Sequence, residues 1–214
     1  MEKAERINRV LNSLEGESEL FRRLPELEFI HDDELQSSVI RTYIDGCPDV
    51  FWERASSSSG KYHPSDERDV AGNWIHTKRV FAEYCNISQS YLNAGLIDEH
   101  ERDEGKAAAL IHDMMKYGWP SDRNVHTVRD HDLIAASVAE HIGGANDTVV
   151  SMIKSHMGPW GEGPQPETDN QWLLHLADKS ASNVNTMIHI YKPAKEITSE
   201  WEDIDVMSSS NVLE

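Results

Sequence analysis

Histidine and aspartate residues recur along the chain at positions where several of them could bind one metal ion. The chain has eleven histidines, and the candidate ligands among its histidines and aspartates fall on five expected helices. The candidate ligands are His76, the adjacent pair His112 and Asp113, His131, His156 and Asp178. A helix bundle can direct side chains from several helices to one interior point. Imidazole and carboxylate groups together suit a divalent transition metal (Mn, Fe, Co, Ni or Zn) without any thiolate.

Each of these residues also has a simpler explanation. A single histidine on a helix is more often a buried, hydrogen-bonded residue than a metal ligand. His-Asp dipeptides occur by chance, and His131-Asp132 is a second copy in this chain. His156, at the end of its expected helix, could instead satisfy terminal carbonyl groups. The order of the whole set along successive helices favours a metal site over these alternatives.

The elements that would position these residues are all expected to be helical. Apolar spacing, caps and breakers predict helices over residues 2–24, 35–46, 74–86, 91–97, 103–117, 130–142, 147–156 and 170–183. Strand-like alternation is scarce, so the fold class is expected to be all-α. Two polar loops, 56–64 and 158–166, carry most of the Ser, Gly and Pro between helices. Residues 184–191 are ambiguous, and the last residues of the tail are expected to fray.

Length and charge limit the kinds of protein that this chain could be. With 214 residues we expect one domain, with an N-terminal helical region over 1–55, a core over 56–195 and an acidic, partly flexible tail over 196–214. The formal net charge of −18 disfavours stable binding to nucleic acid, and it fits either a high-salt environment or plain solubility. Two cysteines outside any CxxC pair and the lack of a signal core predict a reduced, cytoplasmic protein. No apolar run is long enough to span a membrane, so no membrane partner is expected.

Three short motifs resemble the HD-domain superfamily of metal-dependent phosphohydrolases. They read GNWIHTKRV over residues 72–80, ALIHDMMKYG over 109–118 and LHLADK over 174–179. The resemblance extends over about residues 60–183 and includes the Ser-Gly-Lys-Tyr-His-Pro loop before the first motif. It implies an HD-type helical bundle, here with an N-terminal helical extension.

The resemblance also implies roles for the candidate ligands. The core metal ligands would be His76, His112, Asp113 and Asp178. His131 and His156 match the additional histidines of members that bind two metal ions. One or two ions are therefore expected, with Mg as a further candidate metal, and Asp113 would bridge a pair.

Lys116 is predicted to be a catalytic residue together with Asp113. It lies four residues after His112, one turn along the expected helix. A lysine there could hold a substrate phosphate or donate a proton, or it could be a cation that stabilises the helix C-terminus. Some nucleotidase-like members are expected to carry an acid at this position, so the lysine argues against a simple nucleoside monophosphate phosphatase.

The residues predicted to bind substrate are Lys61, His63, Arg79 and Lys179. Lys61 and His63 belong to the first polar loop, which could cradle phosphate or could be a flexible surface linker. Arg79 shares a helix face with the first candidate ligand, whereas Lys78 is expected to be solvated. Trp160 in the second polar loop could stack on a base, or that loop could be an inert connection.

These features favour an enzyme that hydrolyses phosphate esters or anhydrides of a small-molecule nucleotide. The substrate would be a (deoxy)nucleoside triphosphate or monophosphate. The alternatives are a phosphodiesterase acting on a cyclic or linear dinucleotide, which the six-ligand set and the lysine favour somewhat, and a non-catalytic module that binds a nucleotide or metal. A purely structural helical domain would contain no metal. Assembly into a homo-oligomer stays open.

Overall fold

Helices form all the regular structure of the described chain. The computed structural model describes residues 16–120 and 124–183, and no strand occurs among them. Residues 16–23 are helical, and the elements that follow are η1 (Pro25–Phe29), α2 (Asp33–Gly46), α3 (Val50–Glu53), η2 (Ser65–Glu67), α4 (Gly72–Asn93), α5 (Glu99–Ile111), α6 (His131–Val138), η4 (Ala139–Gly143), α7 (Asp147–Ser155), η5 (Gly158–Trp160) and α8 (Asp169–Ala181). The η4 turn is π-helical, and the other η elements are 3-10 turns. The prediction of an all-α fold is confirmed.

Side-chain caps determine where four helices begin. At α2 the cap is Asp32, whose side chain accepts from two backbone N–H groups. Asn146 accepts a hydrogen bond from a backbone N–H in the first turn of α7. Capping boxes open two more helices, with Asp98 and Glu101 at α5 and Thr168 and Gln171 at α8. Each cap satisfies N–H groups that the first turn of a helix leaves without an intrahelical partner. The starts of α5, α7 and α8 are thus encoded locally, whereas α4 and α6 begin without a side-chain cap.

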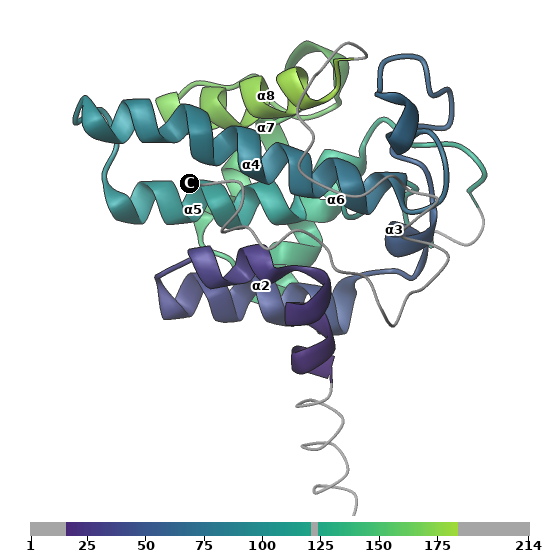
Figure 1. Ribbon diagram of the computed structural model, residues 1–214, viewed down its shortest axis with the longest axis horizontal. Helices are drawn as coiled ribbons and strands as arrows, with labels where there is room; N and C mark the ends of the chain where they lie inside the picture. The colour runs from purple at the N-terminus through teal and green to yellow at the C-terminus, as the bar shows by residue number, and fades with distance from the viewer. Residues whose placement is uncertain (1–15, 121–123, 184–214) are drawn as a thin grey trace, which may run out of the picture.

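Helix α4 packs against both α5 and α8, whereas α2, α6 and α7 pack mainly against other elements. Figure 1 shows α8 along one side of α4 and α5 along the other, and both pairs are in contact. Helix α5 in turn contacts α2 and α7. The first half of α4, residues 72–82, is buried on every side. A polar side chain in this stretch must therefore find its partners inside the protein.

Helices α4 and α5 approach closely where Gly105 of α5 meets Tyr84 of α4. A Cβ atom at position 105 would lie 1.8 Å from the Tyr84 hydroxyl oxygen, so the contact requires glycine. The Tyr84 hydroxyl donates to the side-chain oxygen of Asn170, and the Asn170 amide donates to the backbone carbonyl of Glu101. These bonds join α4, α5 and α8 at the end of the bundle distant from the histidines.

The bounds of two helices, α4 and α5, differ from the prediction. Helix α5 starts earlier than residue 103 because the capping box precedes it, and it ends at Ile111 rather than at residue 117. It ends there because the imidazole of His112 donates to the carbonyl of Ala109, which a further turn would need for the next backbone N–H. Helix α4 is continuous and joins two segments that were predicted as separate helices.

Some predictions lie outside the described residues, namely those for residues 2–15, 184–191 and the acidic tail. The division into regions 1–55, 56–195 and 196–214 stays a prediction. From the N-terminal region, α2 packs against α5 and η4. None of the helices in the described part is both long and apolar enough to cross a membrane.

Candidate metal centre

The structure brings the six candidate ligands together in the interior, in two groups that share Asp113. The first group is His76, His112, Asp113 and Asp178, and the second is Asp113, His131 and His156. They come from α4, the C-terminal end of α5, the start of α6, the C-terminal end of α7, and α8. Within each group, one possible ligand atom per residue lies within 4.8 Å of all the others.

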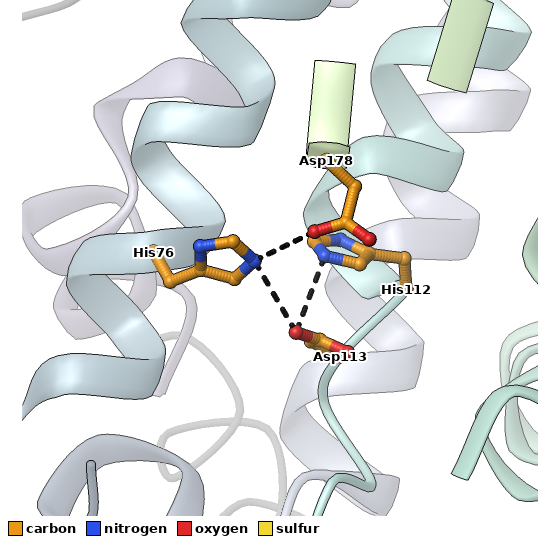
Figure 2. A group of neighbouring side chains, drawn as sticks. All are labelled: His76, His112, Asp113 and Asp178. Carbon is orange, nitrogen blue, oxygen red and sulfur yellow. Dashed lines mark hydrogen bonds and ion pairs between the residues drawn. The ribbon is translucent and has the colours of Figure 1, made fainter. Parts of the chain in front are cut away.

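In the first group the side chains point toward one another around a common centre (Figure 2). The Nε2 atom of His76 lies 3.0 Å from Asp178 Oδ1 and 3.4 Å from Asp113 Oδ2. The Nε2 atom of His112 lies 3.5 Å from the same Asp113 oxygen. Two imidazole nitrogens and two carboxylate oxygens thus converge, which is a donor set suited to a divalent transition metal.

The second oxygen of Asp113 faces the other group. Asp113 Oδ1 lies 3.0 Å from Nε2 of His131 and 3.6 Å from Nε2 of His156. The carboxylate therefore stands between two sets of imidazoles, with one oxygen toward each. This is the arrangement that a carboxylate bridging two ions would need.

Three of the histidines are oriented by the same local device. The Nδ1 atoms of His112, His131 and His156 each lie 2.7 Å from the backbone carbonyl three residues earlier in the chain. A carbonyl can only accept, so Nδ1 carries the proton and Nε2 keeps a lone pair. For His156 the bond also satisfies a terminal carbonyl of α7, so the capping role and the ligand role coexist in one side chain.

The lone-pair atoms of these histidines fit a metal. In the part of the chain that the structure describes, Nε2 of His112, His131 and His156 and Oδ1 of Asp113 are buried without a hydrogen-bond partner. Buried polar atoms left without a partner are costly, and so many at one point are unusual. Coordination of a cation would satisfy all four, since each is an electron-pair donor aimed at the same region.

Glu67 supports the first group, and sequence reasoning missed it. This carboxylate is fully buried, and its Oε2 atom lies 3.1 Å from Nδ1 of His76 and 2.7 Å from Nδ1 of His63. Its other oxygen accepts from the guanidinium of Arg79. A carboxylate behind a metal-binding histidine fixes the ring and makes its other nitrogen a better ligand. The spacing of four residues between His63 and Glu67 was visible in the sequence but is too common to be a signal.

The charges of the cluster stabilise one another. Burial disfavours the charged form of His76, but Glu67 and Asp178 outweigh burial and raise its pKa to about 9. Burial opposes ionisation of Glu67 too, yet His76 and the other cations around it lower its pKa to about 2. For Asp113, Lys116 outweighs burial and holds the pKa well below its usual range. Burial also opposes ionisation of Asp178, but its hydrogen bond to His76 outweighs burial and lowers its pKa. Glu67, Asp113 and Asp178 are thus all ionised near neutral pH, as metal ligands and their partners must be.

A cleft of about 420 Å³ leads from the surface to the cluster. Its walls include His63, Lys116, Arg129, Trp160, Asp178 and Lys179. The volume falls in the range of small-molecule sites. Three cations line the cleft in a chain whose formal net charge is −18, so the cleft suits an anionic ligand.

Lys116 contacts the cluster directly. Its Nζ atom donates to Asp113 Oδ2, and the side chain reaches the cleft although it is 9% exposed. Burial disfavours its charged form, but Asp113 and Asp178 outweigh burial and raise its pKa. Because α5 ends at Ile111, Lys116 does not stand in the last turn of that helix. The ion pair with Asp113 gives this lysine a partner inside the cluster, and its catalytic role stays a prediction beside the helix-dipole alternative.

Of the four predicted substrate-binding residues, two line the cleft, one is exposed and one is buried away from the cleft. His63 and Lys179 line the cleft, and their binding of substrate stays a prediction. Lys61 is exposed, with its Nζ atom 5.1 Å from the centre of the Tyr62 ring. The prediction for Arg79 was wrong, because its guanidinium is buried and binds the carboxylates of Glu67 and Asp66 instead of facing the cleft.

Two further expectations about polar residues need correction. Lys78 is buried and forms an ion pair with Glu26, although it was expected to be solvated. Loop 56–64 is irregular as predicted, but it is not a loose linker. The backbone N–H of Ser56 donates to the Glu67 carbonyl at 2.9 Å, which anchors the start of the loop.

A family model described as HD domain matches residues 73–183, just over half of the chain. The matched segment contains all six candidate metal ligands and both lysines of the cleft. Comparison with curated proteins and comparison with solved structures gave no match.

Proposed function

The chain belongs to the HD-domain family, and on that basis we propose that it is a metal-dependent phosphohydrolase whose substrate is a nucleotide. The family implies hydrolysis of phosphate compounds with a divalent metal. The observation that carries the proposal is the position of Asp113, whose two oxygens face two separate sets of imidazole nitrogens. Four donor atoms, Nε2 of His112, His131 and His156 and Oδ1 of Asp113, are buried without a hydrogen-bond partner, which supports a metal-binding role for this cluster.

His76, His112, Asp113 and Asp178 would hold a first ion, and Asp113, His131 and His156 a second. A bound divalent cation supplies polarisation of a phosphoryl oxygen and lowers the pKa of water toward neutrality. The protein contributes the orientation of the ligands, because each imidazole is held through its Nδ1 atom. Glu67 does this for His76, and backbone carbonyls do it for the other three histidines.

Lys116 and His63 would act on the substrate itself. The Lys116 ammonium is charged at neutral pH, lies at the inner end of the cleft and can donate hydrogen bonds to a phosphoryl oxygen. His63 lines the cleft and its Nδ1 atom is bound to Glu67, so its other ring nitrogen is free to exchange a proton with a ligand. Lys179 and Arg129 add positive charge near the mouth, where the remaining phosphates of a nucleotide would lie.

A phosphodiesterase acting on a cyclic or linear dinucleotide is the second candidate. The convergence of six ligands rather than four, together with a lysine in contact with Asp113, supports it. The two candidates differ in their products. Hydrolysis of a nucleoside mono- or triphosphate releases phosphate, pyrophosphate or triphosphate, whereas hydrolysis of a dinucleotide releases a nucleotide with a free phosphomonoester.

The test combines metal analysis with product analysis. The purified chain should contain one or two divalent ions and, with Mn, Co, Mg or Zn restored, should hydrolyse a member of a panel of nucleoside mono-, di- and triphosphates and dinucleotides. Asp113→Ala should lose both bound metal and hydrolysis, while the exposed Asp45→Ala should lose neither. Full activity of the Asp113 variant would refute the assigned metal site. A metal-free protein that binds nucleotide without hydrolysis would refute the proposed enzyme and leave a binding module.

A further inference from the structure

Trp160 is a large aromatic side chain left half open to solvent at the wall of the substrate cleft. Its exposed fraction is 51%, whereas Trp74 in the core is fully buried. It lies in η5, a few residues after the candidate ligand His156, and it lines the same cleft as Lys116 and Asp178. An indole exposed at this place offers a flat apolar surface beside the phosphate-binding region.

The indole ring is held in position by α8. It stacks on the imidazole of His175 with a centroid separation of 5.8 Å and an interplanar angle of 9°. The Nζ atom of Lys179 lies 3.4 Å from the centre of the indole ring. His175 and Lys179 are one helical turn apart, and the His175 ring is itself fixed by a bond from Nδ1 to the carbonyl of His156. The ring is therefore preorganised rather than loosely exposed.

The loop that carries Trp160 is also anchored on its far side. The backbone N–H of Gly163 donates to Oδ2 of Asp132, a fully buried carboxylate next to the candidate ligand His131. The same Asp132 oxygen would lie 2.6 Å from a Cβ atom at position 161, so glycine is needed for this close approach. Both ends of the loop are thus tied to elements that carry candidate metal ligands, and its geometry is coupled to the site.

We propose that Trp160 is the platform on which the base of the nucleotide stacks, and that it selects phosphates that carry an aromatic base. This inference rests on the proposed function, because it assigns the non-reacting part of the same substrate. The features that support it are the half-exposed indole, its fixed position against His175 and Lys179, and a cleft that also contains Lys116. Stacking on an aromatic side chain needs no particular hydrogen-bond pattern, so all common bases gain affinity from it, whereas phosphates without a base bind only through their phosphate and sugar.

The experiment measures binding to the metal-loaded full-length chain by calorimetry. The probes are the four common ribonucleoside 5′-monophosphates and ribose 5-phosphate, which shares their phosphate and sugar but has no base. Trp160→Ala should weaken binding of the nucleotides by about 5- to 150-fold, the usual range for loss of one base–aromatic stack. It should leave the affinity for ribose 5-phosphate unchanged, and Trp160→Phe should restore part of the nucleotide affinity.

Trp119→Ala is the matched control, because Trp119 is 66% exposed and lies outside this cleft. This variant should bind all probes like the wild type. An equal loss of affinity for nucleotides and for ribose 5-phosphate in Trp160→Ala would show a purely structural role and overturn the proposal. So would a wild-type protein that binds no nucleotide better than ribose 5-phosphate. If the protein binds nucleotides more tightly than ribose 5-phosphate through Trp160 but hydrolyses no substrate, the proposed enzyme is refuted and the stacking role of Trp160 stands.

Discussion

Replacement of Glu67 by glutamine tests how this buried carboxylate supports the metal site. Both carboxylate oxygens accept, one from the two imidazoles of His63 and His76 and the other from Arg79. A glutamine amide has one accepting oxygen and one donating nitrogen. Turned one way, the amide places a donor against the Arg79 guanidinium. Turned the other way, it places a donor against the imidazoles, whose Nδ1 atoms can accept only if the proton moves to Nε2, which in His76 is the nitrogen that faces the metal site.

Two separate effects are expected from Glu67→Gln. Loss of one partner from a buried ion pair costs about 3–5 kcal/mol, and the low end applies because Asp66 still contacts Arg79 at 3.3 Å. The free energy of unfolding should therefore fall by roughly 3 kcal/mol. Metal affinity should fall by about 10- to 100-fold, because His76 loses the group that fixes its ring.

The assay is competition for metal with a chromophoric chelator, performed where circular dichroism shows each variant to be folded. Denaturant unfolding of the metal-free proteins measures the change in the free energy of unfolding separately. Asp66→Asn is the control, since it removes another carboxylate from Arg79 and leaves Glu67 in place. It should lower stability without the drop in metal affinity. A folded Glu67→Gln protein that binds metal as tightly as the wild type would refute this role of Glu67.

Three further predictions concern charged groups in the interior. Lys116→Ala should lower kcat by about 100-fold or more while bound metal stays near the wild-type amount, and unchanged steady-state kinetics would exclude a catalytic role. In the metal-free protein, the raised pKa of His76 contributes stability that is fully present below about pH 6.5 and is lost as pH rises to about 9, roughly 3 kcal/mol in all. Thermal unfolding over this pH range should show the loss in the metal-free but not in the metal-loaded form; identical profiles would contradict it. Glu26→Ala should destabilise the protein by about 3–5 kcal/mol in denaturant because it leaves the Lys78 ammonium unpaired inside, and exposed Glu28→Ala is its control.

Local sequence signals predicted most of the secondary structure because they act over a few residues. Capping residues, apolar spacing and glycine or proline breakers placed α2, α7 and α8 within a residue or two of their observed bounds. The prediction failed at the end of α5, where the side chain of His112 takes a backbone carbonyl that the helix would otherwise use. That competition depends on the orientation of one imidazole, which apolar spacing does not report.

The chain by itself determined the chemical kinds of the candidate ligands, their order on successive helices and the membership in the HD-domain family. Which polar side chains are enclosed, and by what, was decided only by the tertiary structure. From the sequence, Lys78 was predicted to lie in solvent and Arg79 to bind the substrate. The packing of α3, α5 and α8 around α4 instead encloses both side chains. Burial then obliges each charge to find a carboxylate, and Glu67 reaches His76 only because the preceding loop folds back against α4. These ion pairs and hydrogen bonds form between residues that the folded chain brings together, so no local sequence pattern can predict them.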